Sequence, residues 1–260
     1  MNSKQILTAI TFSGIALVSQ SALAGVIVTT YAGSANFGNG GVGYENGSVA
    51  PNPNSNTNLA AVGIGGDSFT STNYGYDFSG TGQFNTWCVD IYHWMSGGTV
   101  TYTVGTGSDL AALLTTLRPG GPDGTQRVGQ LLQLANEVYG SVDTKTESAA
   151  FQLAVWAITY GSVDQSGNYH INTTDPDFHV GSSATVNSAF GVLANQWLGN
   201  LGSAPITGNY SLTYLNDGTQ GYTQDMIVLT SHPKTVPEPG SMALLGIGLG
   251  ILGIIKLRKA

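Results

Sequence analysis

The sequence is poor in cysteine and in charge. It holds one cysteine, Cys88, in 260 residues, so an intramolecular disulfide is excluded. Charged residues make up 9% of the chain; eight are basic and 15 are acidic, which gives a formal net charge of −7 at pH 7. Nucleic-acid binding is therefore disfavoured, because it requires a basic face that neutralises phosphates.

The N-terminal residues 1–24 have the order of a secretory signal peptide. Lys4 precedes an apolar stretch from Ile6 to Val18, and Ala22-Leu23-Ala24 supplies small residues before a cleavage point. The sequence predicts export, with the mature chain beginning near Gly25. A lone thiol in an exported protein requires an explanation, which is pairing with another chain, burial or a reactive role.

The C-terminal residues 232–260 contain a second targeting segment. Pro237, Glu238 and Pro239 precede an apolar run, Met242–Ile255, and a basic tip. The run is short for a bilayer span, which requires about 20 residues. A plain C-terminal anchor is one interpretation, but the tripartite order resembles the PEP-CTERM sorting signal. The resemblance implies an exosortase-type processing enzyme, transient anchoring in the membrane, and delivery to the cell envelope, surface or extracellular matrix.

Residues 25–231 change their hydrophobic period twice. Stretches rich in β-branched residues predict strands within 25–105, helical periodicity predicts an insert of about four helices within 106–200, and strand patterns return within 205–231. The predicted fold is α+β: a β-rich barrel or sandwich lobe, a helical insert, and C-terminal strands that return to the β lobe.

Local signals refine these elements. Thr144 and Glu147 have the spacing of a capping box, which begins a helix that ends at Gly161. We also expect a loop over residues 32–58, a strand over Phe84–Tyr92, one helix over Ser183–Leu198, and a hairpin-like turn at Asn216-Asp217-Gly218.

Two short segments place polar side chains in apolar surroundings. Trp87-Cys88-Val89-Asp90 holds the cysteine, and Phe151-Gln152-Leu153-Ala154-Val155-Trp156 holds a glutamine on a predicted helix. Burying a carboxamide without partners costs about 1–3 kcal/mol. Each residue has a purely structural explanation when taken singly: Gln152 is hydrogen-bonded to neighbouring backbone, and Cys88 packs as a small hydrophobic residue.

Together, the two segments resemble the thioester domains of bacterial surface adhesins. In that family an aromatic-Cys-aliphatic-acidic stretch on the β side faces a Gln-x-Ala-aliphatic-Trp stretch on a helix. Phe151 departs from the small hydroxyl residue that many members carry before the glutamine. The resemblance implies an internal thioester between Cys88 and Gln152. The residues that we expect to support it, by excluding water or by orienting the site, are Trp87, Asp90, Phe151 and Trp156.

A thioester would make the protein a single-turnover covalent binder and not an enzyme. Attack by an amine of a surface or matrix partner would release the Cys88 thiol and leave Gln152 joined to the partner by an amide bond. Two alternatives stay open. One is a noncovalent exopolysaccharide or biofilm-matrix protein with a merely buried cysteine. The other is a cysteine hydrolase or acyltransferase, for which His93 is a poor base because it faces the other side of an ideal strand from Cys88. No motif predicts a cofactor or a metal site.

Overall fold

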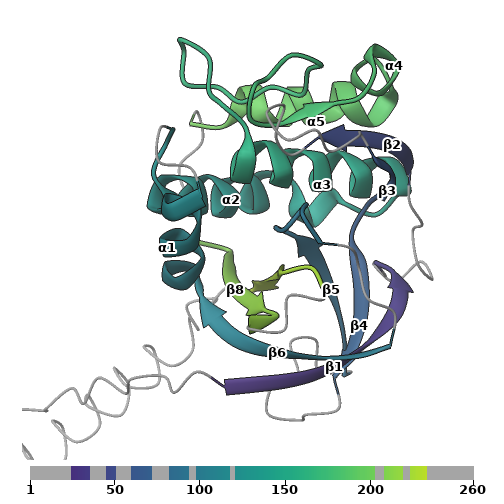
Figure 1. Cartoon of the computed structure of the whole chain (residues 1–260), viewed down its shortest axis with the longest axis vertical. Coiled ribbons are helices and arrows are strands. Elements are labelled where there is room, and N and C mark those ends of the chain that lie inside the picture. Colours follow the sequence, from purple (N-terminus) through teal and green to yellow (C-terminus); the bar gives the residue numbers. More distant parts are fainter. Residues whose placement is uncertain are drawn as a thin grey trace, which may run out of the picture.

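A computed structural model describes residues 25–35, 45–50, 60–71, 82–93, 98–117, 121–202, 208–218 and 223–232. The chain folds into a closed antiparallel barrel covered at one end by layers of helices (Figure 1). The predicted α+β class, with a helical insert and returning C-terminal strands, is confirmed. The predicted signal peptide and sorting segment lie outside the described residues, and the predicted domain boundaries stay predictions.

Six strands form the barrel. Around it they follow the order β1 (Gly25–Ser34), β4 (Asp67–Ser71), β5 (Gln83–Cys88), β9 (Met226–Ser231), β8 (Tyr210–Asn216) and β6 (Thr99–Thr106), and β6 pairs with β1 to close it. Alternate residues along the strands point inward, so Ile27, Phe69, Phe84 and Tyr102 are buried. Strand β5 meets β9 only at its end, where Cys88 pairs with Met226.

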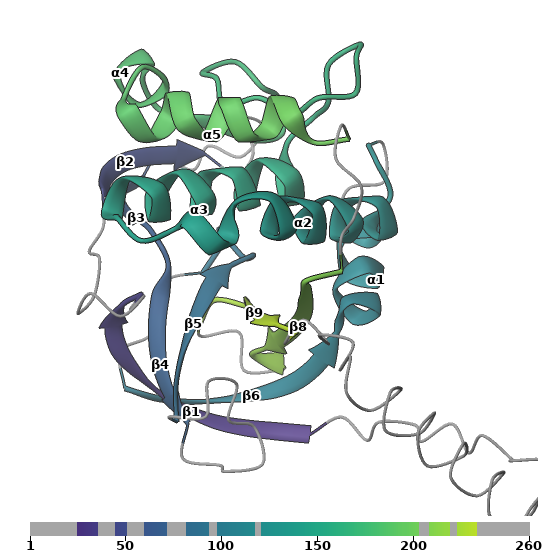
Figure 2. The same cartoon turned by 180° about the vertical axis from the view of Figure 1, so that it is seen from behind.

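The helices begin directly after β6. They are α1 (Gly107–Leu117), α2 (Gly124–Val138), a short 3-10 turn (Tyr139–Ser141), α3 (Lys145–Tyr160), α4 (Ser183–Val186) and α5 (Ala189–Asn200). Helix α3 lies between the barrel and α5 (Figures 1 and 2). Every residue of α3 from Ser148 to Tyr160 is buried, which explains why its sequence is apolar on all sides. The helix therefore forms a central layer that touches the end of β5.

A second, three-stranded sheet was not predicted. Its order is β3 (Ala60–Ile64), β2 (Glu45–Ala50) and β7 (His179–Val180). The prediction of an uninterrupted loop over residues 32–58 was therefore wrong at 45–50. The sequence Glu-Asn-Gly-Ser-Val-Ala has little strand character of its own, and β2 is a strand because it pairs on both sides.

Other predicted element boundaries also differ from those of the structure. Strand β5 ends at Cys88 and not at Tyr92, because the Asp90 carboxylate accepts the backbone N–H of Tyr92 at 2.9 Å and stabilises a turn. The single helix predicted over Ser183–Leu198 is two helices, because Ser188 caps the start of α5.

The β8–β9 connection is likewise longer than the predicted turn. Strand β8 ends at Asn216 and β9 begins at Met226. The backbone N–H of Asp217 donates to the Asp225 carboxylate at 2.8 Å, which holds the two ends of the connection together without a tight hairpin. Within the described part of the chain, no helix has the length and apolar character required to span a membrane.

Candidate functional site

Cys88 is the last residue of β5 and lies where the barrel meets α3. Its side chain is 2% exposed. The residues on either side are held firmly: Trp87 pairs with Ile227 of β9, and the Val89 N–H donates to the Asp225 carbonyl at 2.9 Å. The thiol therefore occupies a fixed position at a barrel rim.

Gln152, in the middle of α3, binds the backbone of Cys88 with both polar atoms of its side chain. The Cys88 N–H donates to Gln152 Oε1 at 2.9 Å, and Gln152 Nε2 donates to the Cys88 carbonyl at 2.8 Å. The carboxamide is fully buried. The pair of hydrogen bonds imitates one step of a β-ladder, with a side chain in place of a neighbouring strand. The two predicted residues, 64 positions apart, are thus brought together.

The thiol of Cys88 is protonated in this environment. Burial raises its pKa well above the ordinary value, and the charges of Asp90 and Asp67 act in the same direction. The Trp156 indole and the Asp90 backbone oppose this rise. Cys88 Sγ–H donates to the Asp90 carbonyl oxygen at 3.0 Å. Any reaction that consumes the thiol proton must break this hydrogen bond.

Aromatic rings pack behind the pair and exclude water. Trp87 and Phe151, the residues directly before Cys88 and Gln152, are both buried, with ring centroids 4.6 Å apart. Tyr139 packs against both rings, edge-on to Trp87 and tilted to Phe151. Gly66 permits this packing, because a Cβ at that position would approach the Trp87 ring to 2.7 Å. Phe151, which stands where many adhesins have a small hydroxyl residue, therefore belongs to an aromatic cluster. This cluster lies on the side of β5 that faces away from the thiol.

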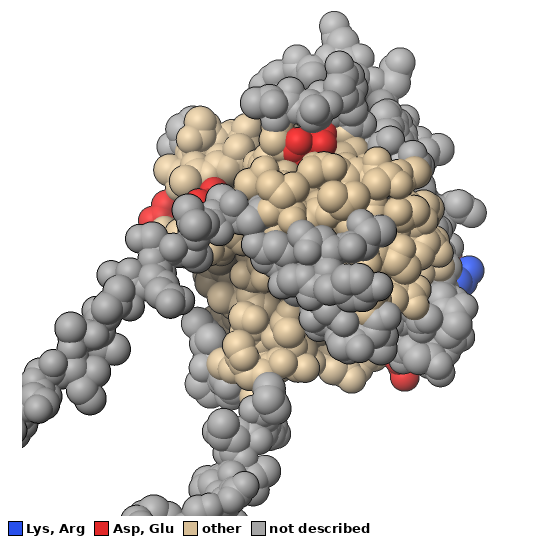
Figure 3. All heavy atoms as spheres, turned by 90° about the horizontal axis from the view of Figure 1, so that it is seen from below, with Lys and Arg blue, Asp and Glu red and all other residues tan. Residues whose placement is uncertain are grey.

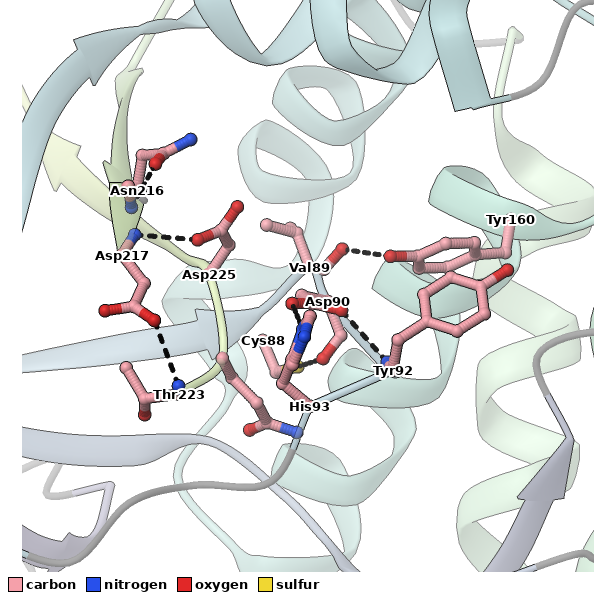
Figure 4. A network of polar contacts seen from close by, with 12 residues as sticks. Cys88, Val89, Asp90, Tyr92, His93, Tyr160, Asn216, Asp217, Thr223 and Asp225 are labelled. Atoms are coloured by element: carbon pink, nitrogen blue, oxygen red, sulfur yellow. Dashed lines mark hydrogen bonds and ion pairs between the residues drawn. The ribbon is translucent and has the colours of Figure 1, made fainter. Parts of the chain in front are cut away.

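Asp90 organises the turn that follows Cys88 (Figure 4). One carboxylate oxygen accepts from the Tyr92 backbone, and the other lies 2.5 Å from His93 Nδ1. The carboxylate therefore caps a turn, while its backbone carbonyl accepts the thiol. The sequence predicts that His93 faces the other side of a strand from Cys88. This reasoning does not apply, because β5 ends at Cys88 and His93 lies in the turn that follows.

Tyr160 is a site residue that sequence reasoning missed. Its hydroxyl donates to the Val89 carbonyl at 2.7 Å, and burial raises its pKa. A signal was present: Gln152, Trp156 and Tyr160 are spaced by four and so share one face of α3. Tyr92, which is 48% exposed, packs edge-on against Tyr160 at the surface.

The acidic loop between α3 and α5 is stabilised by its own side chains. Asp175 accepts the N–H groups of Asp177 and Phe178, and Asp164 pairs with His170 at 2.8 Å. Within the described ranges, no three His, Cys, Asp or Glu side chains gather as metal ligands. On the face drawn in Figure 3, the described Lys and Arg side chains appear only at the edge, and the described acidic side chains form no large patch.

Comparisons with known structures find folds that are similar. The N-terminal domain of the Streptococcus pyogenes pilus tip adhesin Cpa has 12% identity and a TM-score of 0.42, covering 82% of this chain and 98% of that one. The N-terminal thioester domain of the S. pyogenes fibronectin-binding protein SfbI has 11% identity and a TM-score of 0.37, covering 64% and 87%. That of a protein F2 like fibronectin-binding protein from Streptococcus pneumoniae has 9% identity and a TM-score of 0.41, covering 78% and 99%.

The sequence comparisons concern the C-terminus. No curated protein sequence matches the chain. Residues 235–259, which include Pro237, Glu238 and Pro239, match the family model described as the PEP-CTERM protein-sorting motif. The predicted sorting signal is thereby confirmed. The chain carries a PEP-CTERM protein-sorting motif, which indicates an exported protein that is sorted to the cell surface and processed by an exosortase.

Proposed function

We propose that Cys88 and Gln152 form an internal thioester, through which the exported protein attaches covalently to an amine-bearing partner at the cell surface or in the extracellular matrix. One observation carries the proposal: the Gln152 carboxamide is held by two hydrogen bonds against the backbone of the only cysteine, in a buried site.

The contacts favour attack of sulfur on the carboxamide. Holding the carboxamide against the backbone of the residue that carries the sulfur removes much of the entropy cost of their reaction. The Cys88 N–H already donates to Oε1, where negative charge develops when sulfur adds to the carbonyl carbon, and so acts as an oxyanion donor. The S–C bond forms, the C–N bond breaks, and ammonia leaves with the proton that the thiol gives up. No cofactor is required.

The same burial would preserve the product. A thioester is lost to hydrolysis when water reaches it, and the buried rings of Trp87, Phe151 and Trp156 surround the two segments. The side opposite this cluster carries the Asp90 turn and the exposed ring of Tyr92, and we expect a partner to approach the site from there.

An amine is the nucleophile that suits this chain. The net charge of −7 favours the approach of a cationic group such as a lysine side chain. Between Gly25 and Val236 the chain has only Lys145 and Lys234, which limits reaction with itself. Lys145 lies 3.5 Å from Glu45, an ion pair at the start of α3. The amine would add to the Gln152 carbonyl, Cys88 would leave as the thiol, and an amide bond would remain.

Labelling with methylamine tests the proposal. The purified protein is incubated with methylamine, digested and mapped by mass spectrometry. We expect methylamide at Gln152 together with a newly free Cys88 thiol, and neither in a Cys88→Ala variant, which keeps the carboxamide but has no sulfur. Absence of label from folded wild-type protein would contradict the proposal. If Cys88→Ala also retains full matrix association, the function is that of a noncovalent matrix protein.

A further inference from the structure

Trp156 buries a hydrogen-bond donor that has no acceptor. Its side chain is 4% exposed, and its indole Nε1–H is without a hydrogen-bond partner among the residues that the structure describes. Buried polar groups are nearly always satisfied, because an unpaired donor has lost its water and gained nothing. The two polar residues on the same face of α3 follow this rule: Gln152 binds Cys88, and Tyr160 binds the Val89 carbonyl.

The unpaired donor lies beside the sulfur of Cys88. Trp156 follows Gln152 by one turn of α3, and so faces the same end of β5. Gln152, one turn before it, binds the backbone of Cys88, and Tyr160, one turn after it, binds the Val89 carbonyl, so Trp156 faces the cysteine from between them. The indole also lowers the pKa of the Cys88 thiol, which agrees with this position. The N–H makes no hydrogen bond to the neutral thiol, whose hydrogen is directed to the Asp90 carbonyl.

We propose that Trp156 takes part in the chemistry of the site, by donating its indole N–H to the Cys88 sulfur whenever that sulfur carries negative charge. The inference rests on the thioester proposed above and assigns to Trp156 a role beyond exclusion of water.

Both reactions of the site place charge on this atom. When the thioester forms, the thiol loses its proton, the electron pair of sulfur forms the S–C bond, and ammonia departs with that proton. When a partner amine opens the thioester, the S–C bond breaks, its electron pair returns to sulfur, and the proton that the amine sheds ends on the thiol. Apolar burial and the carboxylates of Asp67 and Asp90 oppose the charge at each step.

A donor that is unsatisfied in the ground state is suited to this task. The sulfur of a thiol or thioester is a weak acceptor, whereas a thiolate is a strong one. The hydrogen bond is therefore gained only as charge develops, and it lowers the barrier instead of stabilising the resting state. If Trp156 only excluded water, replacing it would let water and amines reach the thioester more easily, and opening of the thioester would become faster.

The two roles are separated by replacing Trp156 with phenylalanine. Trp156→Phe keeps an aromatic ring and removes the N–H, so we expect methylamine to open the thioester about tenfold more slowly than in wild type. Trp197→Phe is the matched control: it makes the same change in a tryptophan of α5, which lies outside the site. We expect its rate to stay within about twofold of wild type. An unchanged or faster reaction of Trp156→Phe would overturn the inference.

A spectroscopic measurement on the wild-type protein avoids dependence on the variant. In the methylamine-opened protein labelled with ¹⁵N-tryptophan, the indole N–H signal of Trp156 should move as the Cys88 thiol is deprotonated in alkali, while that of Trp197 stays in place. A Trp156 signal that does not move while the thiol titrates would contradict the contact. Wild-type protein that never forms a thioester would defeat the proposed function itself, and the role of Trp156 with it. A thioester that forms and opens normally in Trp156→Phe would defeat only the role of Trp156.

Discussion

At the scale of single residues, the Cys88–Gln152 contact joins the carboxamide side chain to the backbone of the cysteine. Gln152 does not bind the thiol; it binds the backbone N–H and carbonyl of the residue that carries the thiol. The arrangement satisfies both ends of a buried carboxamide, and it leaves the sulfur to interact with Asp90 and Trp156. The carboxamide that would react is therefore positioned by backbone groups that do not themselves react.

The raised pKa of Cys88 predicts a loss of stability in alkali for the protein with a free thiol. Above the ordinary cysteine pKa of about 8.5 the unfolded chain releases the thiol proton while the folded protein retains it, so the free energy of unfolding falls as pH rises. Urea unfolding at about pH 7 and about pH 9.5 measures this loss for the methylamine-opened protein.

The control for this experiment is Cys88→Ala, which has no thiol to titrate. Tyr139 and Tyr169, whose pKa values burial raises to about 12, are present in both proteins and contribute equally to both. A fall of equal size in Cys88→Ala and in the opened protein would show that the thiol is not the group responsible.

At the scale of elements, α3 is the helix on which the site depends, and both of its ends are determined locally. Thr144 and Glu147 form the predicted capping box, and Gly161 is the C-cap. The ends of this helix could be predicted because capping signals involve residues three or four apart. Strands β2 and β7 could not, because their pairing partners are far away in the sequence.

Arg127 of α2 stabilises the C-terminal end of α3. The residue is 1% exposed, and its guanidinium donates to the carbonyls of Ile158 and Gly161 and lies over the ring of Tyr169. A lone arginine on an amphipathic helix gave no sign of this buried role. These are charge-assisted hydrogen bonds to the last turn of the helix that carries Gln152, where a positive charge is also favoured by the helix dipole.

Replacing Arg127 therefore weakens the whole domain. We expect Arg127→Met to lower the free energy of unfolding by about 3 kcal/mol, because two helix carbonyls lose their buried donor. Arg127→Lys keeps the charge but lacks the planar guanidinium, so its free energy of unfolding should lie between those of Arg127→Met and wild type. Thermal or urea unfolding measures both variants. A fall of less than about 0.5 kcal/mol for Arg127→Met would show that the carbonyls find other donors.

At the scale of the whole molecule, a Cys88–Gln152 bond would act as a cross-link between the barrel and the helical layer. It would close a loop of more than 60 residues, since 64 positions separate the two residues. In the chain-entropy description of cross-links, such a loop stabilises the folded state by about 4 kcal/mol. The bond would thus have a structural effect in addition to its chemistry.

Opening the thioester should therefore lower stability as well as release the thiol. We expect methylamine to reduce the free energy of unfolding of the wild-type protein by about 4 kcal/mol, with a lower melting temperature in calorimetry. The same treatment of Cys88→Ala should change nothing. An opened protein as stable as the untreated one would mean that no covalent link joined β5 to α3.

The overall plan of the molecule and the position of its site were predictable to different degrees. Period changes along the chain predict a β-rich barrel or sandwich lobe with a helical insert, and the fold confirms this plan with a barrel. The contact between Cys88 and Gln152 follows from neither period nor charge. It was predicted from two side chains in settings that do not suit them singly, and from the resemblance that the pair carries. The second sheet and the roles of Tyr160 and Arg127 arise from tertiary packing, which short-range patterns do not record.

The most direct test of the central claim is the intact mass of the freshly purified protein under nondenaturing conditions. A thioester between Cys88 and Gln152 predicts a species lighter than the sequence by one ammonia, which Gln152→Glu and Cys88→Ala both lack. A folded wild-type protein at its full sequence mass, with a thiol that reacts as a free cysteine, would contradict the account.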